Sequence, residues 1–357
     1  MEEVQKNRIK GVNIVFLVTI LISVVVPFLP LEFLWERPVL QIVFSQGIIA
    51  LPAIIYMIVH RLPYAETVRF KKMKVADMLL SILFGILIQP VVTLINALSM
   101  VFAKNVIGGS MLEITQQVPF LAGVFLLAVM PAVMEESVYR GVFYNEYSKI
   151  HPLKAALLSG FLFGILHGNI NQFCYAMVMG FIFALLIEAT GSILSTMLVH
   201  FWTNAASVVM LYLYPKLYEM AKAYYNMYRE YGNEPMAAML ESAFGDMTQS
   251  SAEWLNQMLN SASSLQLTVP QVFIMYGPQA LIMGILAILV YKKLAVRNGN
   301  WHRICTYFVK WPEAVEQEVV VAGVQPQKHM VTVPLIIAIV IGVAYMILYE
   351  VLIQIKL

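Results

Sequence analysis

Three short polar patterns interrupt strongly apolar stretches of the chain. Glu135, Glu136 and Arg140 belong to the first, His167 to the second and His200 to the third. Ionisable groups at membrane depth cost several kcal/mol each on insertion, so they persist there for a structural pair or for chemistry. Carboxylates and imidazoles are the side chains of general acid–base catalysis. The three patterns together predict an active site.

Helical spacing decides which groups of the first pattern can meet. Glu136 and Arg140 are four residues apart and share a helix face, while Glu135 points about 100° away from Glu136. Because an unpaired buried charge is so costly, this spacing favours a structural ion pair between Glu136 and Arg140. Glu135 then either stays free for chemistry or serves as a second acceptor for the same arginine.

The other two patterns also place two side chains on one helix face. Phe163 and His167 are four residues apart, as are His200 and Asn204. Taken singly, each histidine predicts a hydrogen-bonded core residue, Asn204 an interhelical hydrogen bond, and Phe163 ordinary packing. Taken together, polar groups on three neighbouring helices predict one polar cavity, lined by Glu135, His167, His200 and Asn204.

The composition sets the solvent in which this cavity must work. Of the 357 residues, 60% are hydrophobic and 12% are charged, and the mean hydropathy is +0.75. These values predict an all-α, polytopic transmembrane helical bundle. Nine stretches approach the length of about 20 residues that crosses a bilayer. They are residues 12–29, 39–59, 78–102, 117–138, 153–168, 173–189, 192–214, 269–291 and 331–354.

Cysteine usage and net charge narrow the possible partners. Cys174 lies in an apolar run and Cys305 in a basic loop, so the sequence predicts no disulfide framework and no cysteine metal site. The net charge is +2, and no basic stripe with interleaved aromatics indicates a nucleic-acid partner. The expected partners are the lipid bilayer and a membrane-associated protein or peptide. The oligomeric state is left open.

The distribution of basic residues predicts the orientation. With a cytoplasmic N-terminus and an extracytoplasmic C-terminus, 17 of the 23 lysines and arginines fall on the cytoplasmic side, which the positive-inside rule favours. The first span is long for a secretory signal, and the segment from Pro27 to Glu32 offers no small-residue cleavage site. We therefore expect this span to be retained.

The spans divide the chain into four predicted regions. Residues 1–116 hold N-terminal membrane spans, and residues 117–214 form a catalytic membrane core. Residues 215–268, bounded by prolines, form an extracytoplasmic helical insert that we expect to lie on the membrane surface or to cap the bundle. Residues 269–357 hold C-terminal spans and a cytoplasmic connector at 294–330, which turns acidic at 313–318 and ends in a glycine- and proline-containing loop.

The three patterns resemble the motifs of a known family. The CAAX protease and bacteriocin-processing family, also called CPBP or Abi, comprises intramembrane proteases and includes the Ras-converting CAAX endoprotease. Its motifs EExxxR, FxxxH and HxxxN occur here in the same order at Glu135 to Arg140, Phe163 to His167 and His200 to Asn204. The resemblance covers about residues 117–213. It implies a helical membrane bundle, a catalytic cavity that opens towards the cytoplasm, and endopeptidase activity near the C-terminus of a substrate.

With this resemblance, the chemistry of each side chain suggests its role. Peptide hydrolysis needs an activated water, which a carboxylate and a neutral imidazole can hold and deprotonate. It also needs donors for the oxyanion, which an imidazole and a carboxamide can supply. Glu135 is therefore predicted as the general base, His167 as its water-positioning partner, and His200 with Asn204 as the oxyanion site. The predicted structural supports are Glu136, Arg140 and Phe163.

Other readings of the same residues remain open. Glu135, His167 and His200 could bind a catalytic zinc ion, but the HExxH motif is absent, so a metal-independent mechanism without a cofactor is favoured. A transporter could use them as a proton relay, although the repeat-related broken helices of transporters are missing. A noncatalytic immunity or scaffold protein is the third reading. Both a prenylated CAAX protein and a small membrane peptide remain open as substrates.

The predicted spans place two of the candidate residues at different depths. Glu135 falls near the cytoplasmic end of the fourth span, whereas His167 lies roughly 21 Å into the fifth. Residues that act on one water should lie at one depth. Helix tilt, a span that begins outside the hydrocarbon, or a deep cavity could each remove the mismatch.

Overall fold

The computed structural model of the chain describes residues 2–105, 107–264, 267–309 and 329–355. These residues form helices and the turns between them. The long helices are α1 (Glu2–Val25), α3 (Pro38–Val59), α5 (Val75–Met100), α11 (Ile170–Thr190), α12 (Leu194–Glu230), α15 (Val269–Arg297) and α18 (Val333–Ile355). One continuous run consists of α7 (Phe120–Val124), η2 (Phe125–Val129), α8 (Met130–Glu136), η3 (Ser137–Tyr144) and α9 (Asn145–Ser148). The shorter helices are η1 (Val26–Phe28), α2 (Glu32–Trp35), α4 (Tyr64–Thr67), α6 (Ile107–Gln117), α10 (Pro152–Leu166), α13 (Glu234–Phe244), α14 (Ser251–Ser264) and α16 (Trp301–Val309).

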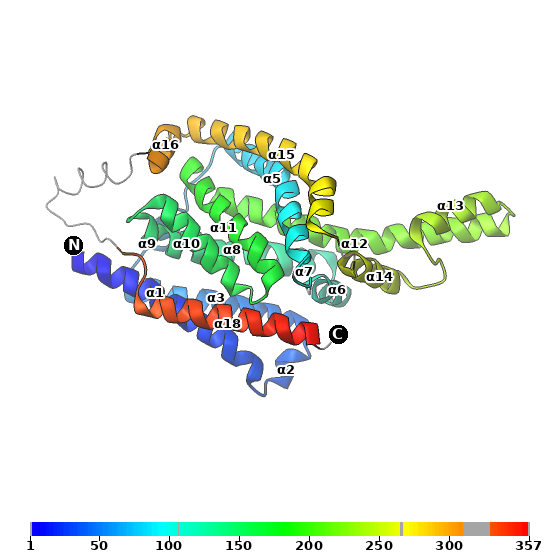
Figure 1. Cartoon of the computed structure of the whole chain (residues 1–357), viewed down its shortest axis with the longest axis horizontal. Helices are drawn as coiled ribbons and strands as arrows, with labels where there is room; N and C mark the ends of the chain where they lie inside the picture. The colour runs from blue at the N-terminus through cyan, green and yellow to red at the C-terminus, as the bar shows by residue number, and fades with distance from the viewer. Residues whose placement is uncertain (1, 106, 265–266, 310–328, 356–357) are drawn as a thin grey trace.

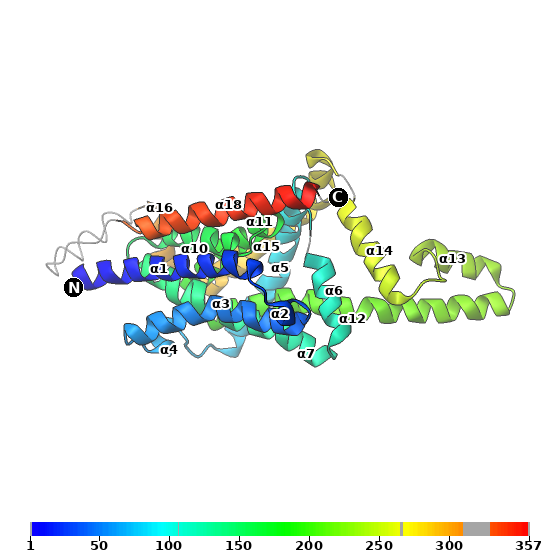
Figure 2. The same cartoon turned by 90° about the horizontal axis from the view of Figure 1, so that it is seen from below.

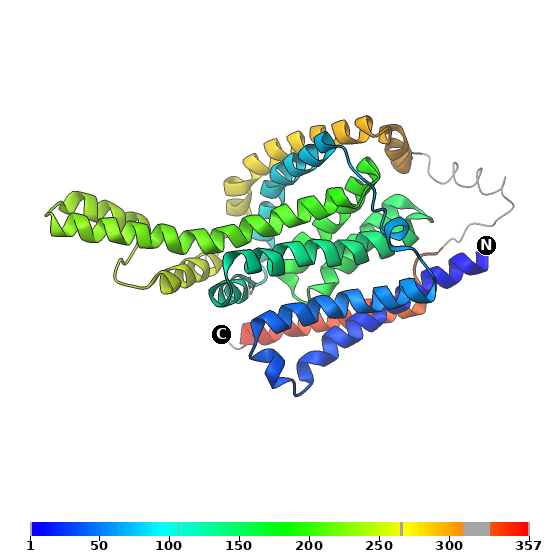
Figure 3. The same ribbon diagram turned by 180° about the vertical axis from the view of Figure 1, so that it is seen from behind.

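The helices form one elongated bundle. In the described part of the chain, eight helices or helical runs are long and apolar enough to cross a membrane, and α10 is a shorter apolar helix among them. α1, α3 and α18 lie on one side of the bundle, α5 and α15 pack together on the other, and the remaining passes lie between (Figures 1 and 3). The two termini lie at opposite ends of the bundle (Figure 1). The predicted polytopic helical bundle is confirmed, and the chain is a multi-pass membrane protein.

The fourth pass is longer than the sequence predicted. The predicted span of 117–138 ends at the cluster of charges, but the helical run continues to Ser148. The predicted end was wrong because the charges of Glu136 and Arg140 compensate each other inside the bundle and do not mark a membrane edge. Arg140 therefore leaves the set of basic residues predicted to lie in cytoplasmic loops, and this set still holds 16 of the 23 lysines and arginines.

This longer pass also removes the depth mismatch. From Ser148 back to Glu135 the helix rises about 20 Å, and α10 rises about 22 Å from Pro152 to its end, where His167 follows. Both residues therefore lie at similar distances from the same end of the bundle.

Small residues let α10 and α11 pack closely as a hairpin. A Cβ atom on Gly160 would lie 2.6 Å from the Met177 carbonyl oxygen and 2.7 Å from the Phe181 nitrogen, and one on Gly180 would lie 2.6 Å from Gly160 Cα. These neighbours are backbone atoms, which cannot move aside as a flexible side chain can. The crossing therefore requires glycine and fixes the distance between the two helices.

The predicted insert is helical and begins inside a helix. α12 has 37 residues, or about 55 Å, and it continues through Pro215 to Glu230. Its outer part and α13 project beyond the bundle along the bundle axis and do not lie across its end (Figure 2). Tyr218 stacks on Trp254 with ring centroids 4.9 Å apart, and this contact holds α14 to α12.

The structure describes only part of the predicted connector at residues 294–330. α16 follows α15 and packs against α10 and α11 at the N-terminal end of the bundle. The predicted acidic stretch at 313–318 and the loop at 323–328 lie outside the described residues.

The glycine crossing generates a stability prediction. Gly160→Ala should lower the free energy of unfolding by on the order of 1–3 kcal/mol, because its Cβ has no space between the two backbones. Gly47→Ala on α3 is the matched control: nothing lies within 4 Å of its Cβ, and alanine favours a helix by roughly 0.5–1 kcal/mol. Thermal unfolding of both variants in detergent measures the difference. Equal melting temperatures would show that the crossing is not tight.

Candidate active site

Glu136 joins the first and third motifs. Its side chain is fully buried, and Oε1 lies 3.1 Å from Arg140 Nη1 and 2.9 Å from His200 Nδ1. The expected ion pair between Glu136 and Arg140 is therefore present, and it extends to His200 on α12. One carboxylate oxygen thus connects the helical run of the fourth pass to the helix that carries the third motif.

Two aromatic rings enclose the Arg140 guanidinium. Arg140 Cζ lies 4.3 Å from the Phe163 ring centroid and 5.1 Å from that of Phe183. Within the described residues none of the three guanidinium nitrogens has a hydrogen-bond partner, so the charge is balanced by the ion pair with Glu136 and by the faces of the two rings. Phe163, expected as a support, contacts the charge directly. Phe183 on α11 has no motif around it and was missed in the sequence.

Glu135 points to a different set of neighbours, as the helical spacing predicts. It is 8% exposed, and its Oε1 accepts a hydrogen bond from Gln46 Nε2 on α3 over 2.9 Å. Its Oε2 lies 3.8 Å from His200 Nε2, which is too long for a direct hydrogen bond. Glu135 and His200 therefore face each other without a direct bond, and Gln46 is a contact that the sequence patterns did not indicate.

His167 ends α10 beside the same aromatic ring. Its Nδ1 lies 2.8 Å from the Phe163 carbonyl oxygen, and the His167 and Phe163 rings are 4.9 Å apart. The Phe163 ring is also close to the third motif, since its centroid lies 6.2 Å from that of the His200 ring. Asn169 Nδ2 donates to the His167 carbonyl oxygen and so stabilises the turn into α11. The second motif thus joins the first and third around Phe163.

Asn204 is held by the backbone of the fourth pass. Its Nδ2 donates to the Leu127 carbonyl oxygen over 3.3 Å, and Leu127 lies in the π-helical stretch η2. A π-helical stretch interrupts the regular α-helical ladder and leaves backbone groups that need other partners. Glu135 and Glu136 lie between η2 and the second π-helical stretch, η3.

The hydrogen bonds fix the protonation pattern of both histidines. A carbonyl oxygen only accepts, so His167 Nδ1 carries a proton, and Nε2 of the neutral ring is an acceptor. An ionised Glu136 likewise only accepts, so His200 Nδ1 also carries a proton. His200 Nε2 is then an acceptor in the neutral ring and a donor in the imidazolium.

Zinc is the metal ion whose usual ligand types match the candidate residues. Zinc sites gather at least three protein ligands at about 2.0–2.3 Å from the ion. No three His, Cys, Asp or Glu side chains gather in this way within the ranges that the structure describes. The proposed zinc set of Glu135, His167 and His200 therefore does not form a ligand cluster.

An apolar pocket lies on α8 and α12, the helices that also carry Glu135 and His200. It has a volume of about 340 Å³. Its walls come from η2, α8 and α12, and from α4 with the loop that joins α4 to α5. Phe201, which follows His200, and Val133, which precedes the two glutamates, line it together with Tyr64 and Phe70. The pocket thus shares α8 and α12 with the polar cluster.

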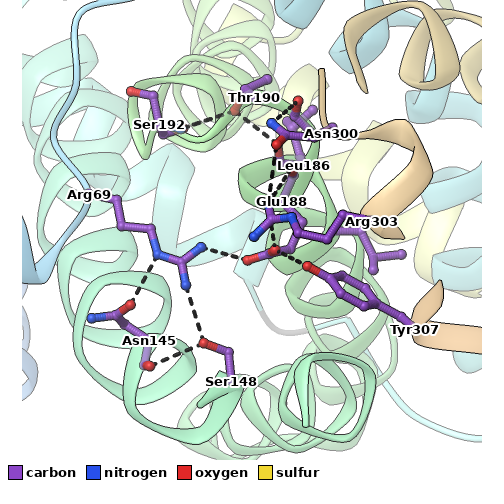
Figure 4. A network of polar contacts seen from close by, with 12 residues as sticks. Arg69, Asn145, Ser148, Leu186, Glu188, Thr190, Ser192, Asn300, Arg303 and Tyr307 are labelled. Carbon is purple, nitrogen blue, oxygen red and sulfur yellow. Dashed lines mark hydrogen bonds and ion pairs between the residues drawn. The ribbon is translucent and has the colours of Figure 1, made fainter. Parts of the chain in front are cut away.

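A second buried carboxylate organises the N-terminal end of the bundle (Figure 4). Glu188, near the end of α11, is 1% exposed and pairs with Arg69 Nη1 at 2.5 Å and Arg303 Nη2 at 3.1 Å, while Tyr307 donates to it over 2.6 Å. Burial alone would lower the pKa of Arg69, but the Glu188 carboxylate outweighs burial and raises it. The three motifs do not predict this network, although an acidic residue in a long apolar run was its signal.

This network also holds the loop that forms one wall of the apolar pocket. Arg69 donates to the Asn145 and Ser148 side chains, and its carbonyl oxygen accepts from the Ile193 nitrogen. From Asn145 the helix rises about 15 Å to Glu135, so the network is a separate layer from the candidate active site. It positions Phe70 at the pocket.

Comparisons with known proteins agree with the motif region. Residues 117–206 match the family described as "Type II CAAX prenyl endopeptidase Rce1-like". A protein of Bacillus subtilis (strain 168) named "Putative membrane peptidase YdiL" is 28% identical over 102 residues, which are 28% of this chain and 41% of that protein. The chain thus covers about two fifths of this curated relative. No solved structure matches the chain significantly. The resemblance to CAAX-type proteases is confirmed over the region that carries the three motifs.

Proposed function

We propose that the chain is an intramembrane endopeptidase that hydrolyses a peptide bond near the C-terminus of a membrane-associated protein or peptide. The observation that carries this proposal is the pair of facing groups, Glu135 Oε2 and His200 Nε2, held 3.8 Å apart in a buried setting. The similarity to a membrane peptidase and to CAAX-type proteases supports the reaction class.

In the proposed mechanism, Glu135 activates the attacking water. Glu135 Oε2 takes one proton from the water. The second O–H of the water donates a hydrogen bond to Nε2 of the neutral His167, as the protonation pattern of His167 allows. The water oxygen then forms a bond to the carbonyl carbon of the substrate. Glu135 passes its proton to the peptide nitrogen, and the C–N bond breaks to give a carboxylic acid and an amine. Transfer of the acid proton to the amine then leaves a carboxylate and an ammonium ion.

Charge balance supports a donor role for His200. Ionised Glu135 and Glu136 with Arg140 carry a net charge of −1, and a protonated His200 would bring the cluster to zero. In that state, Nε2 carries a hydrogen that can stabilise the oxyanion. Uncompensated charge is unfavourable at membrane depth, which favours this balance.

The bond from Asn204 to Leu127 is compatible with an oxyanion role. A carboxamide nitrogen carries two hydrogens, and one of them is used on the Leu127 carbonyl oxygen. That bond restricts the rotation of the amide and leaves the second hydrogen for the substrate. Preorganised donors of this kind lower the barrier because they need no reorientation during the reaction.

The apolar pocket supports a substrate with an apolar group near the scissile bond. Its lining side chains are hydrophobic or aromatic, and it shares α8 and α12 with the catalytic cluster. A prenyl group of a CAAX protein or an apolar side chain of a membrane peptide would each suit this surface.

We also propose that the end of the bundle with the N-terminus and the Glu188 network is cytoplasmic. The loop at residues 60–74, which belongs to this end, is rich in lysine and arginine, as the positive-inside rule requires. The insert of α13 and α14 is then extracytoplasmic, as is the C-terminus.

A substitution of the general base tests the function. Glu135→Gln should keep the fold and abolish cleavage, because it removes the group that takes the water proton. The matched control is Glu350→Gln, which changes another buried carboxylate on α18 and should keep wild-type cleavage. Comparison of C-terminal peptides in membranes that contain each variant measures the outcome. Equal cleavage by wild type and Glu135→Gln would refute the assignment.

Single-cysteine labelling tests the orientation. On a background with Cys174 and Cys305 replaced by serine, Lys72→Cys should react with an impermeant reagent added from the cytoplasmic side. Glu230→Cys, at the end of α12, should react from the opposite side. Both residues are exposed. Labelling of both from one side, or the reverse pattern, would overturn the proposed orientation.

Chelation tests the metal-independent mechanism. If Glu135 and His167 activate the water without a metal ion, purified protein should keep its activity after exhaustive chelation and contain less than one zinc per chain by elemental analysis. Glu135→Gln, prepared in parallel, should contain the same amount of zinc. Activity that is lost on chelation and restored by zinc would establish the zinc mechanism instead.

A further inference from the structure

Gln46 brings a polar group from the N-terminal part of the chain to Glu135. It lies in the middle of α3, is 7% exposed, and donates from Nε2 to Glu135 Oε1 over 2.9 Å. α3 packs against α8, so this bond joins two membrane helices at the level of the candidate site. Gln46 lies outside the three motifs and outside the residues 117–206 that match the family.

The chemistry of the two groups fixes how the amide is turned. An ionised carboxylate only accepts hydrogen bonds, so it must meet the NH₂ group of Gln46 and not the amide oxygen. Gln46 Oε1 is therefore on the other arm of the amide, where it is buried and has no hydrogen-bond partner among the described residues. An unfilled buried acceptor is unfavourable, and beside a reactive carboxylate it is open to a donor that arrives with a ligand.

The same bond gives different tasks to the two oxygens of Glu135. Gln46 holds Oε1, and Oε2 faces His200 Nε2 at 3.8 Å. Because a hydrogen bond on one oxygen restricts the last torsion of the side chain, the other oxygen keeps one direction. A base that keeps its direction needs less rearrangement to reach the transition state.

We infer that Gln46 is a positioning residue that holds Glu135 Oε2 towards the attacking water and offers its free carbonyl oxygen to the N–H of the scissile peptide. The inference rests on the proposed peptidase function. During hydrolysis the peptide nitrogen receives the proton that Glu135 took from the water, and the C–N bond breaks. An acceptor beside this nitrogen stabilises it as it gains that hydrogen.

The alternative is that Gln46 only links α3 to α8, and enzyme kinetics separate the two roles. Gln46→Met keeps the length of the side chain but removes its donor and acceptor. With a peptide identified from the membrane comparison above, kcat should fall about 10- to 100-fold while KM changes by less than about threefold. Gln46→Asn, which keeps the amide on a shorter arm, should recover part of kcat.

The matched control is Gln41→Met, five residues earlier on the same helix. It should keep the wild-type kcat and KM. A purely structural link predicts instead that Gln46→Met lowers the melting temperature and leaves kcat unchanged in the folded fraction, and this result would overturn the inference.

Infrared difference spectra of the purified protein test the bond without any substrate. Gln46→Met should shift a carboxylate stretching band of the wild type, and the shift should vanish when the same change is made in Glu135→Gln protein. If the shift is missing, Gln46 does not orient Glu135 and the inference fails, whatever the protein cleaves. If the shift is present but the wild type hydrolyses no peptide, the proposed function fails together with the catalytic part of the inference, while the orientation of Glu135 stands.

Discussion

The buried contact of Glu136 with Arg140 and His200 is the interaction on which the rest of this structure depends. It lets a segment with three ionisable residues run through the middle of a membrane bundle. Removal of one partner from such a pair costs about 3–5 kcal/mol, because the remaining charge stays buried without compensation. The contact also fixes the proton on His200 Nδ1 and holds the fourth pass to α12. Glu135 can therefore face the candidate reaction space without itself carrying the structural ion pair.

The division of roles between the adjacent glutamates follows from helix geometry. Glu136 points to a cation and an imidazole that are both buried, whereas Glu135 points to an amide and to a space in front of His200. Two identical side chains thus have different chemical surroundings because they point in different directions. Differences of this kind separate acid, base and structural roles in many active sites.

Local features of the chain were readable from the sequence, and contacts between distant helices were not. The 3.6-residue period predicts the pair of Glu136 with Arg140, and the apolar lengths predict the passes. The end of the fourth pass was misplaced because buried charges that compensate each other look like a membrane edge. Gln46 and Phe183 reach the site through packing of α3 and α11, for which no spacing rule exists. The three motifs nevertheless lie around one ring, that of Phe163.

One helix connects the candidate active site to the projecting insert. α12 carries His200 and Asn204 near one end and continues as a single helix to Glu230. Pro215 lies inside this helix and lacks the N–H of a regular backbone hydrogen bond, so one bond of the helical ladder is missing there. We therefore expect a sideways load on the insert to bend α12 at Pro215 before it tilts the part of the helix that carries His200. Bending at this proline would leave the candidate active site in place when the outer arm moves.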